Sequence, residues 1–312
     1  MLLRFEELLH FALINKSTDI HFEIIRSKLE ISVRAISGFK SFKVKNNDYQ
    51  LLEYIKYISN LNLIESELPQ SGSFSYVFSD QEYFFRVASI KSAFMETCVI
   101  RILNKFFLDI NIFNNVIDDI YNLLNKETGM IVFSGPTGSA KTTSLYSFIQ
   151  MFTGKKIYSI EDPIEIFFDN IVQISVNKNR GLTYKSGIKQ VLRHDPDIIV
   201  IGEIRDENAA QMAIRAAITG HLVVTTIHSK NAIGVINRLH DLGVSYNDIY
   251  ENIIFISNQR LLKALEKNER WCVYEVINEK AIEKISKEGR TNYKQPDIQT
   301  IVQGLKNQNK VQ

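Results

Sequence analysis

The stretch Gly135-Pro-Thr-Gly-Ser-Ala-Lys-Thr-Thr143 follows an apolar run at 130–134 and opens a helix-forming run at 141–152. Glycines let such a loop wrap so that successive backbone N–H groups point at phosphate oxygens, and the helix N-terminus adds partial positive charge. The Lys141 ammonium can reach β- and γ-phosphates, and the Thr142 hydroxyl can hold Mg²⁺. The strand–loop–helix order therefore predicts an α/β domain that binds ATP and Mg²⁺. The residues expected to bind the nucleotide are Gly135, Pro136, Thr137, Gly138, Ser139, Ala140, Lys141, Thr142 and Thr143.

Ala140 stands where loops of this pattern have a glycine before the lysine. If this position needs a positive φ, alanine costs on the order of 1 kcal/mol in backbone strain. The strain would weaken the loop without abolishing phosphate binding, because the amide that faces phosphate is still present. We therefore expect ATP hydrolysis, and the alternative is a scaffold that binds ATP without turnover.

A second constellation is the apolar run at 198–201 followed by Gly-Glu-Ile-Arg-Asp at 202–206. Four β-branched residues indicate a buried strand that delivers Glu203 to its carboxyl end, beside the phosphate loop. A carboxylate there can orient and deprotonate the attacking water, or hold Mg²⁺ through water. Glu203 is thus predicted to be catalytic and to bind the metal; the alternative is a surface glutamate that caps the next helix.

Acidic residues also follow the predicted strand at 157–160. Glu161, Asp162 and Glu165 come directly after it, and carboxylates near a triphosphate can help to position Mg²⁺ and water. An ordinary acidic turn with proline is equally consistent with this segment. We predict that Glu161 and Asp162 lie in the nucleotide site and that Glu165 supports catalysis.

Two histidines flank the apolar run at 222–227. A neutral imidazole at either end of such a strand can sense the γ-phosphate through a hydrogen bond. Each histidine alone is also consistent with a hydrogen-bonded core residue. We predict a catalytic role for His228 and a nucleotide-binding role for His221.

Length and composition limit the possible functions. A chain of 312 residues suits two domains, and 45% hydrophobic with 23% charged residues is typical of a soluble globular protein. The net charge of +2, from 37 basic and 35 acidic residues, gives no electrostatic basis for a dedicated nucleic-acid binder. Cys98 and Cys272 have no CxxC spacing and are most simply reduced thiols. No stretch approaches the roughly 18 uncharged apolar residues of a membrane span.

Hydrophobic periodicity divides the chain into two domains. Residues 1–104 read as an α+β domain with an amphipathic first helix and two groups of alternating strands. Residues 105–115 read as a linker, although the apolar spacing at 112–124 predicts a helix. Residues 116–312 alternate strands and helices, which predicts a mostly parallel sheet covered on both faces, followed by a polar, partly disordered C-terminal tail.

The motifs GPTGSAKTT, IEDPIE, DPDIIVIGEIRD and TGHLVVTTIHSKNA resemble, in this order, the Walker A, Asp box, Walker B and His box of the secretion/pilus assembly ATPase family. The resemblance spans about residues 17–277, and the ordered set is highly specific. Its further matches are the segments 17–21, 69–70, 238–243, 259–261 and 273–276, and the arginines of PheArgValAla and ValIleArgIleLeu.

This resemblance implies a RecA-like P-loop NTPase domain preceded by a smaller, PAS-like α+β domain, assembled into a homohexameric ring. By motif match, Arg86 and Arg101 of the first domain would approach the γ-phosphate when the domains close over ATP. Both lie on or just after alternating strands, so a solvated surface position is the alternative. Ser73 stands where the family usually has an arginine, which removes one charged contact.

Other features narrow the resemblance. The family often carries a four-cysteine zinc module near 261–269, but this segment has no cysteine, so we expect no zinc. We also expect no counterpart of the extra amino-terminal docking domain that secretion and pilus-extension members carry. The chain looks most like the competence-type ATPases of Gram-positive bacteria. That implies a cytoplasmic protein, peripheral at the membrane through a polytopic platform protein, with no direct DNA binding; pilus retraction and type II secretion are the alternatives.

Overall fold

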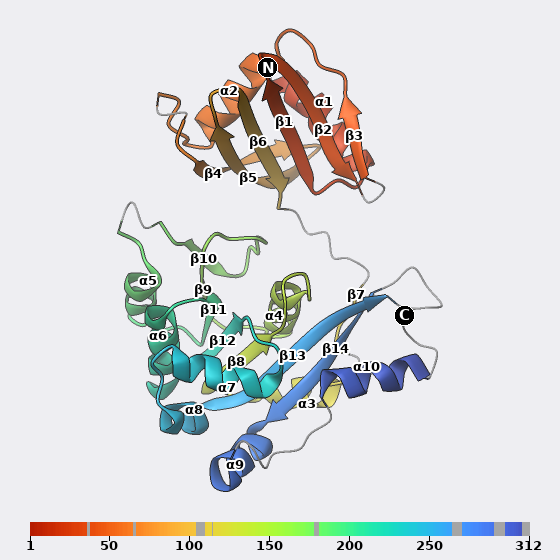
Figure 1. Ribbon diagram of the computed structural model, residues 1–312. Coiled ribbons are helices and arrows are strands. Elements are labelled where there is room, and N and C mark those ends of the chain that lie inside the picture. Colours follow the sequence, from red (N-terminus) through yellow and green to blue (C-terminus); the bar gives the residue numbers. More distant parts are fainter. Residues whose placement is uncertain are drawn as a thin grey trace. The chain divides into compact units, whose positions relative to one another are not determined.

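The computed structural model describes residues 1–35, 38–64, 67–103, 110–113, 115–177, 181–263, 270–289 and 297–307. They form two compact units (Figure 1). Unit 1 comprises Met1–Lys105 with Glu165–Phe167, and unit 2 comprises Phe106–Ile164 and Phe168–Gln312. Each unit has its own sheet and its own hydrophobic core.

Unit 1 is built on an antiparallel sheet in the order β3-β2-β1-β6-β5-β4. Its described elements are α1 (Leu2–Ile14), β1 (Asp19–Ile25), β2 (Lys28–Ala35), β3 (Gly38–Phe42), α2 (Asp48–Ile58), β4 (Gln70–Phe78), β5 (Gln81–Lys91) and β6 (Met95–Ile102). The amphipathic first helix and the two groups of alternating strands expected from the sequence are present. Strand β6 was not among the expected strands, and it pairs with both β1 and β5, which joins the two predicted strand groups into one sheet.

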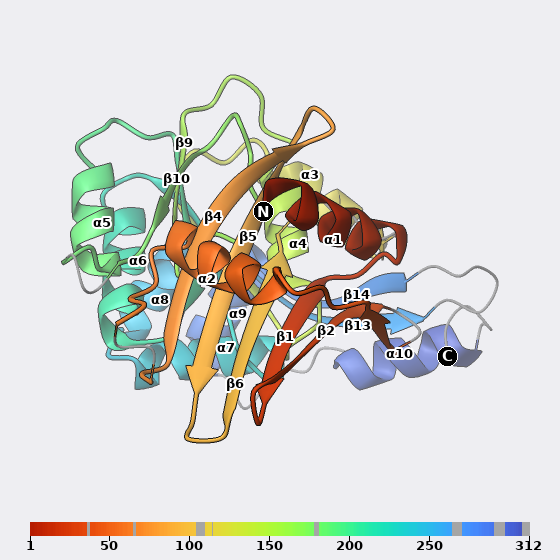
Figure 2. The ribbon, with the colours of Figure 1, turned by 90° about the horizontal axis from the view of Figure 1, so that it is seen from above.

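Side chains alternate between the two faces of this sheet, as the period-two pattern requires. Phe22, Phe85 and Ile100 are fully buried on one face, and α1 and α2 lie against that face (Figure 2). Phe5 of α1 meets Phe85 edge-on, with 5.5 Å between the ring centroids. The other face carries the polar members of the same strands, including Arg101.

A buried ion pair joins α1 to α2. The Arg4 guanidinium donates to both carboxylate oxygens of Asp48 at 2.8 Å, and the backbone N–H of Lys45 donates to the same carboxylate at 2.7 Å. Burial raises the pKa of Asp48, but these hydrogen bonds outweigh burial and hold the pKa below its ordinary value. Asp48 therefore stabilises unit 1 as an anion.

We expect Asp48→Asn to lower the free energy of unfolding by about 3 kcal/mol at pH 7, because Arg4 loses its buried counter-charge and keeps only the exposed carboxylate of Glu7. A group with a depressed folded-state pKa contributes stability above its unfolded pKa and loses it as the pH falls through the folded pKa. The gap between wild type and variant should be constant from about pH 7 to pH 5 and shrink below about pH 4, the unfolded value for aspartate. Urea denaturation of the full chain at several pH values measures this gap.

The matched control for this prediction is the exposed pair Lys28–Glu30, at 2.8 Å between Nζ and Oε1. Lys28→Gln should leave the free energy of unfolding nearly unchanged, because water screens exposed ion pairs. A gap for Asp48→Asn that persists unchanged at pH 3, or that is absent at pH 7, would contradict the assigned role of the ion pair.

Unit 2 is built on an eight-stranded sheet in the order β10-β9-β11-β12-β8-β13-β14-β7. Its strands are β7 (Ile110–Asn111), β8 (Gly129–Ser134), β9 (Ile157–Glu161), β10 (Val172–Ser175), β11 (Ile198–Ile204), β12 (Leu222–Ile227), β13 (Ile253–Lys263) and β14 (Arg270–Asn278). Its described helices are α3 (Ile117–Leu123), α4 (Lys141–Ile149), α5 (Tyr184–Val191), α6 (Glu207–Ile218), α7 (Ala232–Asp241), α8 (Tyr246–Asn252), α9 (Glu279–Glu288) and α10 (Ile298–Asn307). Neighbouring strands are parallel except for β13 and β14, which confirms the expected mostly parallel sheet.

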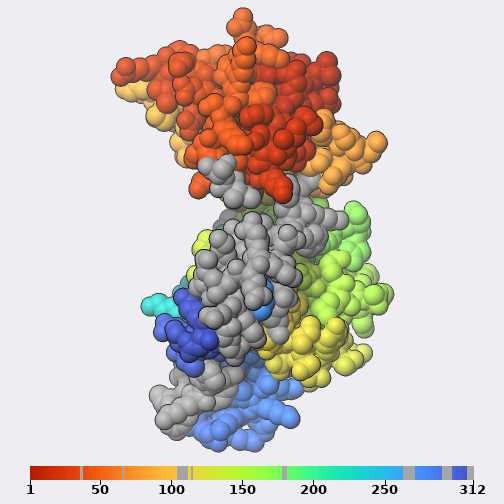
Figure 3. All heavy atoms as spheres, turned by 90° about the vertical axis from the view of Figure 1, so that its right-hand side faces the viewer, coloured from red at the N-terminus to blue at the C-terminus, as the bar shows by residue number. Residues whose placement is uncertain are grey.

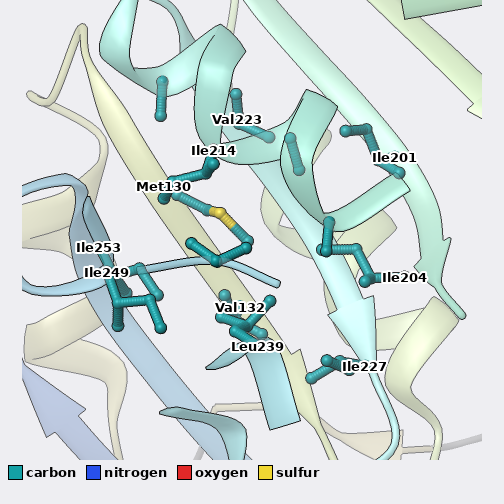
Figure 4. Close-up of a cluster of buried hydrophobic side chains, with 14 of the residues drawn as sticks. Met130, Val132, Ile201, Ile204, Ile214, Val223, Ile227, Leu239, Ile249 and Ile253 are labelled. Atoms are coloured by element: carbon teal, nitrogen blue, oxygen red, sulfur yellow. The ribbon is translucent and has the colours of Figure 1, made fainter. Parts of the chain in front are cut away.

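The central strands β8, β9 and β12 are buried at every position, as expected for parallel strands covered on both faces. Figure 4 shows one of the resulting core clusters, to which β8 contributes Met130 and Val132, β11 contributes Ile201 and Ile204, and the strand between them, β12, contributes Val223 and Ile227. Leu239 of α7 closes this cluster. Because the strands run in parallel, their carboxyl ends meet at one edge of the sheet.

Two helix caps fix how the chain leaves that edge. Asp206 accepts a hydrogen bond from the Ala209 N–H at 2.9 Å and begins α6 directly after β11. Asn231 accepts from the Gly234 N–H at 2.8 Å and begins α7 shortly after β12. The residues between each strand and its helix are therefore held at the carboxyl edge.

The first helix of unit 2 begins later than the sequence predicted. The apolar spacing indicated a helix over 112–124, but α3 starts at Ile117. Phe113 has a φ of 64°, which no helix tolerates, and its ring is buried beside Phe133 and Tyr274. Burial of Phe113, rather than helix formation, accounts for this part of the apolar pattern.

Some predicted features lie partly outside the described residues. These are the linker at 105–115, the segment at 264–269 considered for zinc, and the C-terminal tail beyond α10. Helix α10 lies on the surface of unit 2 (dark blue in Figure 3), with Ile298 as its buried residue. Within the described ranges, no helix combines the length and apolar character needed to cross a membrane.

Candidate nucleotide-binding site

The predicted phosphate loop connects the carboxyl end of β8 to the first turn of α4, as expected. Gly135 and Gly138 both have positive φ, 150° and 77°. At Gly135 a Cβ would lie 2.6 Å from the backbone oxygen of Gln259, so only glycine fits against strand β13. The Ser139 hydroxyl donates to the Pro136 carbonyl at 2.8 Å and closes the loop on itself. Pro136 and Thr137 are exposed at the tip of the loop.

Lys141 begins α4 and folds back over the loop. Its Nζ donates to the carbonyl oxygens of Gly135 at 3.1 Å and Pro136 at 3.0 Å. The same ammonium lies 3.5 Å from Nδ1 of His228. Thr142 and Thr143 follow on the first helical turn and are half-buried. The loop therefore presents a lysine and a helix N-terminus to the same space, the arrangement that binds phosphate.

Ala140 adopts the left-handed conformation on which the strain argument depends, with φ 67° and ψ 31°. Ala140→Gly should therefore remove strain of about 1 kcal/mol and tighten the binding of a non-hydrolysable ATP analogue by about five-fold. Titration calorimetry on both proteins measures the change.

The control for this prediction is a glycine-to-alanine substitution at Gly138, a second loop position with positive φ. Gly138 has a φ of 77° and an added Cβ would meet nothing within 4 Å, so Gly138→Ala introduces backbone strain without a clash. It should weaken analogue binding by a similar factor. Unchanged or weaker binding in Ala140→Gly would show that strain at Ala140 does not limit the loop.

Glu203 lies at the carboxyl end of β11 and is mostly buried, with 17% of its side chain exposed. Its Oε1 lies 3.0 Å from Nε2 of His228, which follows β12. Its Oε2 accepts from Nε and Nη2 of Arg205, each at 2.7 Å. The hydrogen bond to Glu203 raises the pKa of Arg205, so the guanidinium is charged. The structure thus brings Lys141, His228 and Glu203 together. Their roles in binding and catalysis stay predictions.

Arg205 is the residue at this site to which the sequence analysis gave no role. Arg205 follows the last residue of β11, Ile204, so the alternation of side chains along a strand does not predict its direction. The available signal was the presence of a cation two residues after the carboxylate in the sequence. In the present structure, Arg205 holds the oxygen of Glu203 that His228 does not contact.

Glu161 ends β9 and is buried beside β11. A Cβ on Gly202 would lie 3.1 Å from its Cγ, so the two strand ends are in close contact. Its Oε1 accepts from the Ser159 hydroxyl at 2.7 Å and from Nε2 of Gln173 at 3.0 Å. Burial, together with this carboxylate, raises the pKa of Tyr146, so that phenol stays protonated. Glu161 is thus a hydrogen-bonded carboxylate next to the strand that carries Glu203.

The other two acidic residues differ from Glu161. Asp162 is half-buried directly after β9. Glu165 is exposed and belongs to the three residues grouped with unit 1. The roles of both residues stay predictions.

His221 does not lie at this edge of the sheet. It precedes β12, and its carbonyl accepts from the N–H of Gly129 at the start of β8. Strand β12 spans six residues, or about 20 Å at about 3.3 Å per residue, between His221 and His228. The His221 ring contacts the Ala216 carbonyl, 3.3 Å from Nδ1. The sequence predicted that His221 lies beside the nucleotide, and this placement is wrong within one chain. His221 is a hydrogen-bonded residue at the edge of the sheet opposite to the phosphate loop.

Arg86 and Arg101 lie in unit 1, directly opposite each other on β5 and β6. Arg101 donates from Nε to Asp19 of β1 at 2.8 Å and is 58% exposed. Ser73 lies opposite Arg86 on β4. The two guanidinium groups therefore share the sheet face that does not carry the core residues.

The donor set at the loop fits Mg²⁺. The Thr142 hydroxyl and the Glu203 carboxylate are hard oxygen ligands, and Mg²⁺ keeps several waters and takes few protein ligands. Across the described ranges, no group of three or more His, Cys, Asp or Glu side chains has metal-binding geometry. A site that uses one hydroxyl, one carboxylate and the phosphates of a nucleotide does not need such a group.

Comparisons with known proteins agree with this geometry. The chain is 31% identical to "Competence protein ComGA" of Bacillus subtilis (strain 168), over 96% of this chain and 91% of that protein. It is 33% identical to "Putative type II secretion system protein E" of Escherichia coli (strain K12), over 80% of this chain and 52% of that protein. The chain thus spans about half the length of the type II secretion relatives that it matches.

Solved structures share the fold. The pilus retraction motor PilT with bound ADP superposes with a TM-score of 0.78 at 24% identity, covering 98% of this chain and 94% of that one. The ATPase DotB of Legionella pneumophila gives a TM-score of 0.71 at 21% identity, covering 99% and 88%. The sequence model of the family described as "Type II/IV secretion system protein" matches residues 2–305. On this match and the identity to its relatives, the chain belongs to the type II/IV secretion system protein family.

Proposed function

We propose that this chain is a motor ATPase that hydrolyses Mg-ATP to drive assembly of a type IV pilus-like pseudopilus for DNA uptake. The observation that carries the ATPase proposal is the run of contacts from Lys141 through His228 to Glu203. The ammonium of Lys141 can bind phosphate and the carboxylate of Glu203 can activate water, and the imidazole of His228 contacts both groups. ATP hydrolysis needs a phosphate-binding cation and a water-activating carboxylate close together.

In the proposed reaction, the loop amides and the N-terminus of α4 bind the β- and γ-phosphates. Lys141 exchanges its two loop carbonyls for phosphate oxygens. Thr142 and Glu203 are the residues that would hold Mg²⁺, which would neutralise phosphate charge when bound. Glu203 orients the attacking water and accepts its proton, which requires its carboxylate to leave Arg205. His228 senses the γ-phosphate, and Glu161, Asp162 and Glu165 support the site.

The remaining parts of the proposal concern the assembly. We infer that unit 2 is a RecA-like P-loop NTPase domain, that unit 1 is PAS-like, and that six chains form a ring. Arg86 and Arg101 reach the γ-phosphate on closure and make turnover depend on it. The fold similarity to PilT and DotB supports the domain assignments.

Similarity to the competence protein over 96% of the chain supports a competence role. The proposed partner is a polytopic platform protein of the inner membrane, which holds the ATPase at the cytoplasmic face; we expect neither DNA binding nor zinc. Pilus retraction and type II secretion are alternatives within the family, and recovery of the membrane partner by pulldown from the source cell separates them. Recovery of a retraction or secretion platform, rather than a competence platform, would overturn the competence role.

Phosphate release from ATP by the purified full chain tests the ATPase proposal. We expect turnover that requires Mg²⁺ and is lost in Lys141→Ala, which removes the phosphate-binding cation. The alternative is a scaffold that binds ATP without turnover, and the strained Ala140 is the observation that favours it. Nucleotide binding without any phosphate release would establish the scaffold and reject the motor.

A further inference from the structure

The hairpin of β13 and β14 sends two buried polar side chains under the phosphate loop. Gln259 and Tyr274 lie directly opposite each other on the two strands, and Ser144 is on the second turn of α4. All three residues are at most 1% exposed. Nothing in the proposed reaction uses them.

Their hydrogen bonds converge on the last two carbonyls of the loop. Nε2 of Gln259 donates to the Ser139 carbonyl at 2.6 Å and to the Ser144 hydroxyl at 3.0 Å. The Ser144 hydroxyl lies 3.2 Å from the Ala140 carbonyl and 2.7 Å from the Tyr274 hydroxyl. All these contacts are satisfied together if Tyr274 donates to Ser144 and Ser144 donates to Ala140.

The hydrogen bond to the Ser139 carbonyl sets the orientation of the Gln259 amide, although this orientation leaves Oε1 of the amide without a partner. Both of its hydrogens are used, while its Oε1 is buried without a hydrogen-bond partner. Turning the amide over would place Oε1 against the Ser139 carbonyl, where two acceptors repel each other. The unpaired, buried Oε1 of Gln259 lowers the free energy of unfolding. The protein therefore keeps the contact to the Ser139 carbonyl although the arrangement is less stable.

Fixing these carbonyls also fixes the amides on their far side. A trans peptide is planar, with its C=O and N–H pointing in opposite directions. Holding the Ser139 oxygen toward Gln259 therefore turns the Ala140 N–H away from β13. The Ala140 oxygen accepts from both the N–H and the hydroxyl of Ser144, at 2.9 Å and 3.2 Å, and these two contacts together orient the Lys141 N–H. These two amides open α4, where a helix presents donors to an anion.

We propose that Gln259, with Ser144 and Tyr274, is a positioning residue that aims the Ala140 and Lys141 amides at the β-phosphate of the bound nucleotide. This inference rests on the proposed nucleotide site and names residues outside its phosphate-contacting set. Gln259 also meets the first residue of the loop, since its backbone oxygen occupies the space of a Gly135 side chain. The loop is thus held at both ends by β13.

The test compares ADP affinity and melting temperature of the full chain. Gln259→Met keeps the length of the side chain and removes both donors, and we expect the Kd for ADP to rise about ten-fold or more. Tyr274→Phe removes one donor to Ser144 and leaves Gln259 in place, so a rise of about two-fold to three-fold is expected. The KM for ATP should rise in parallel, with a smaller change in kcat.

The control is Ile249→Ala in α8, which loses buried side-chain volume in the core without contacting the loop. If Gln259 only stabilised the fold, this variant would weaken ADP binding as much as Gln259→Met does at an equal loss of melting temperature. That result, or an unchanged Kd in Gln259→Met, overturns the inference.

Two further outcomes keep the test decisive. If Gln259→Met does not fold, Ser144→Ala removes the hydroxyl that links Gln259 and Tyr274 to the Ala140 carbonyl, and a rise in the Kd for ADP is expected. An unchanged Kd in that variant overturns the positioning role of the three residues. If wild-type protein fails to bind ADP, the proposed nucleotide site itself is wrong, and the inference falls with it. Binding by wild type with no loss in the variants rejects the positioning role alone.

Discussion

Glu203→Gln is expected to lower ATP turnover by about 10²-fold to 10⁴-fold, the range that a positioned general base contributes. Glutamine keeps the shape of the side chain and can still contact His228 and Arg205, but it cannot accept a proton from water. ADP affinity should stay within a few fold of wild type, because the phosphates are held by the loop and Lys141. Phosphate release and ADP titration on the same preparations measure both quantities.

The matched control is Glu207→Gln, four residues further along the chain at the start of α6. Its carboxylate accepts a hydrogen bond from Gln211 at 3.1 Å and is exposed, so the substitution should leave turnover unchanged. Equal turnover in wild type and Glu203→Gln would show that Glu203 is not the general base. The alternative interpretation, a glutamate that caps the next helix, would then be favoured.

Arg86→Ala and Arg101→Ala are each expected to lower turnover by about 10³-fold or more, the effect of losing an arginine that meets the γ-phosphate in the transition state. A triphosphate needs more positive charge than Lys141 supplies. ADP affinity should be nearly intact in both variants, because ADP has no γ-phosphate. The affinities for ADP and for a non-hydrolysable ATP analogue, measured beside turnover, separate these effects.

Arg34→Ala is the control, because Arg34 lies opposite Asp19 on the neighbouring strand β2, as Arg101 does on β6. It should leave turnover unchanged while removing a similar charge from the same sheet. Removing Arg101 also breaks its ion pair with Asp19, so melting temperatures must accompany the kinetics. A fall in ADP affinity as large as the fall in analogue affinity would show that the arginines stabilise the fold instead.

The parts of the candidate site whose positions follow from the sequence are those set by the local order of strand, loop and helix. The phosphate loop, Lys141 and Glu203 each follow a run of buried β-branched or apolar residues, and a parallel sheet brings the ends of such runs to one edge. The same rule could have separated the two histidines. His221 and His228 were placed at the two ends of one strand, and only the carboxyl end meets the phosphate loop.

The parts that the sequence did not predict depend on non-local pairing. Burial alternates along β6, with Cys98 and Ile100 buried and Arg101 exposed, but the sequence from Cys98 to Ile100 is continuously apolar. Its place between β1 and β5 requires pairing with a segment 70 to 82 residues earlier, from Ile25↔Met95 to Asp19↔Arg101. Gln259 is polar and fully buried, so hydropathy gives no sign that it faces the core. Its burial is explained only by the loop carbonyl, which comes from a position 120 residues away in sequence.

The most direct test of the central claim, that residues 135–143 form a nucleotide site, is titration calorimetry of the full chain with ADP. We expect saturable binding of one ADP per chain, competed by ATP and abolished or strongly weakened in Lys141→Ala. Absence of binding in wild type, or equal binding in wild type and Lys141→Ala, would contradict this claim.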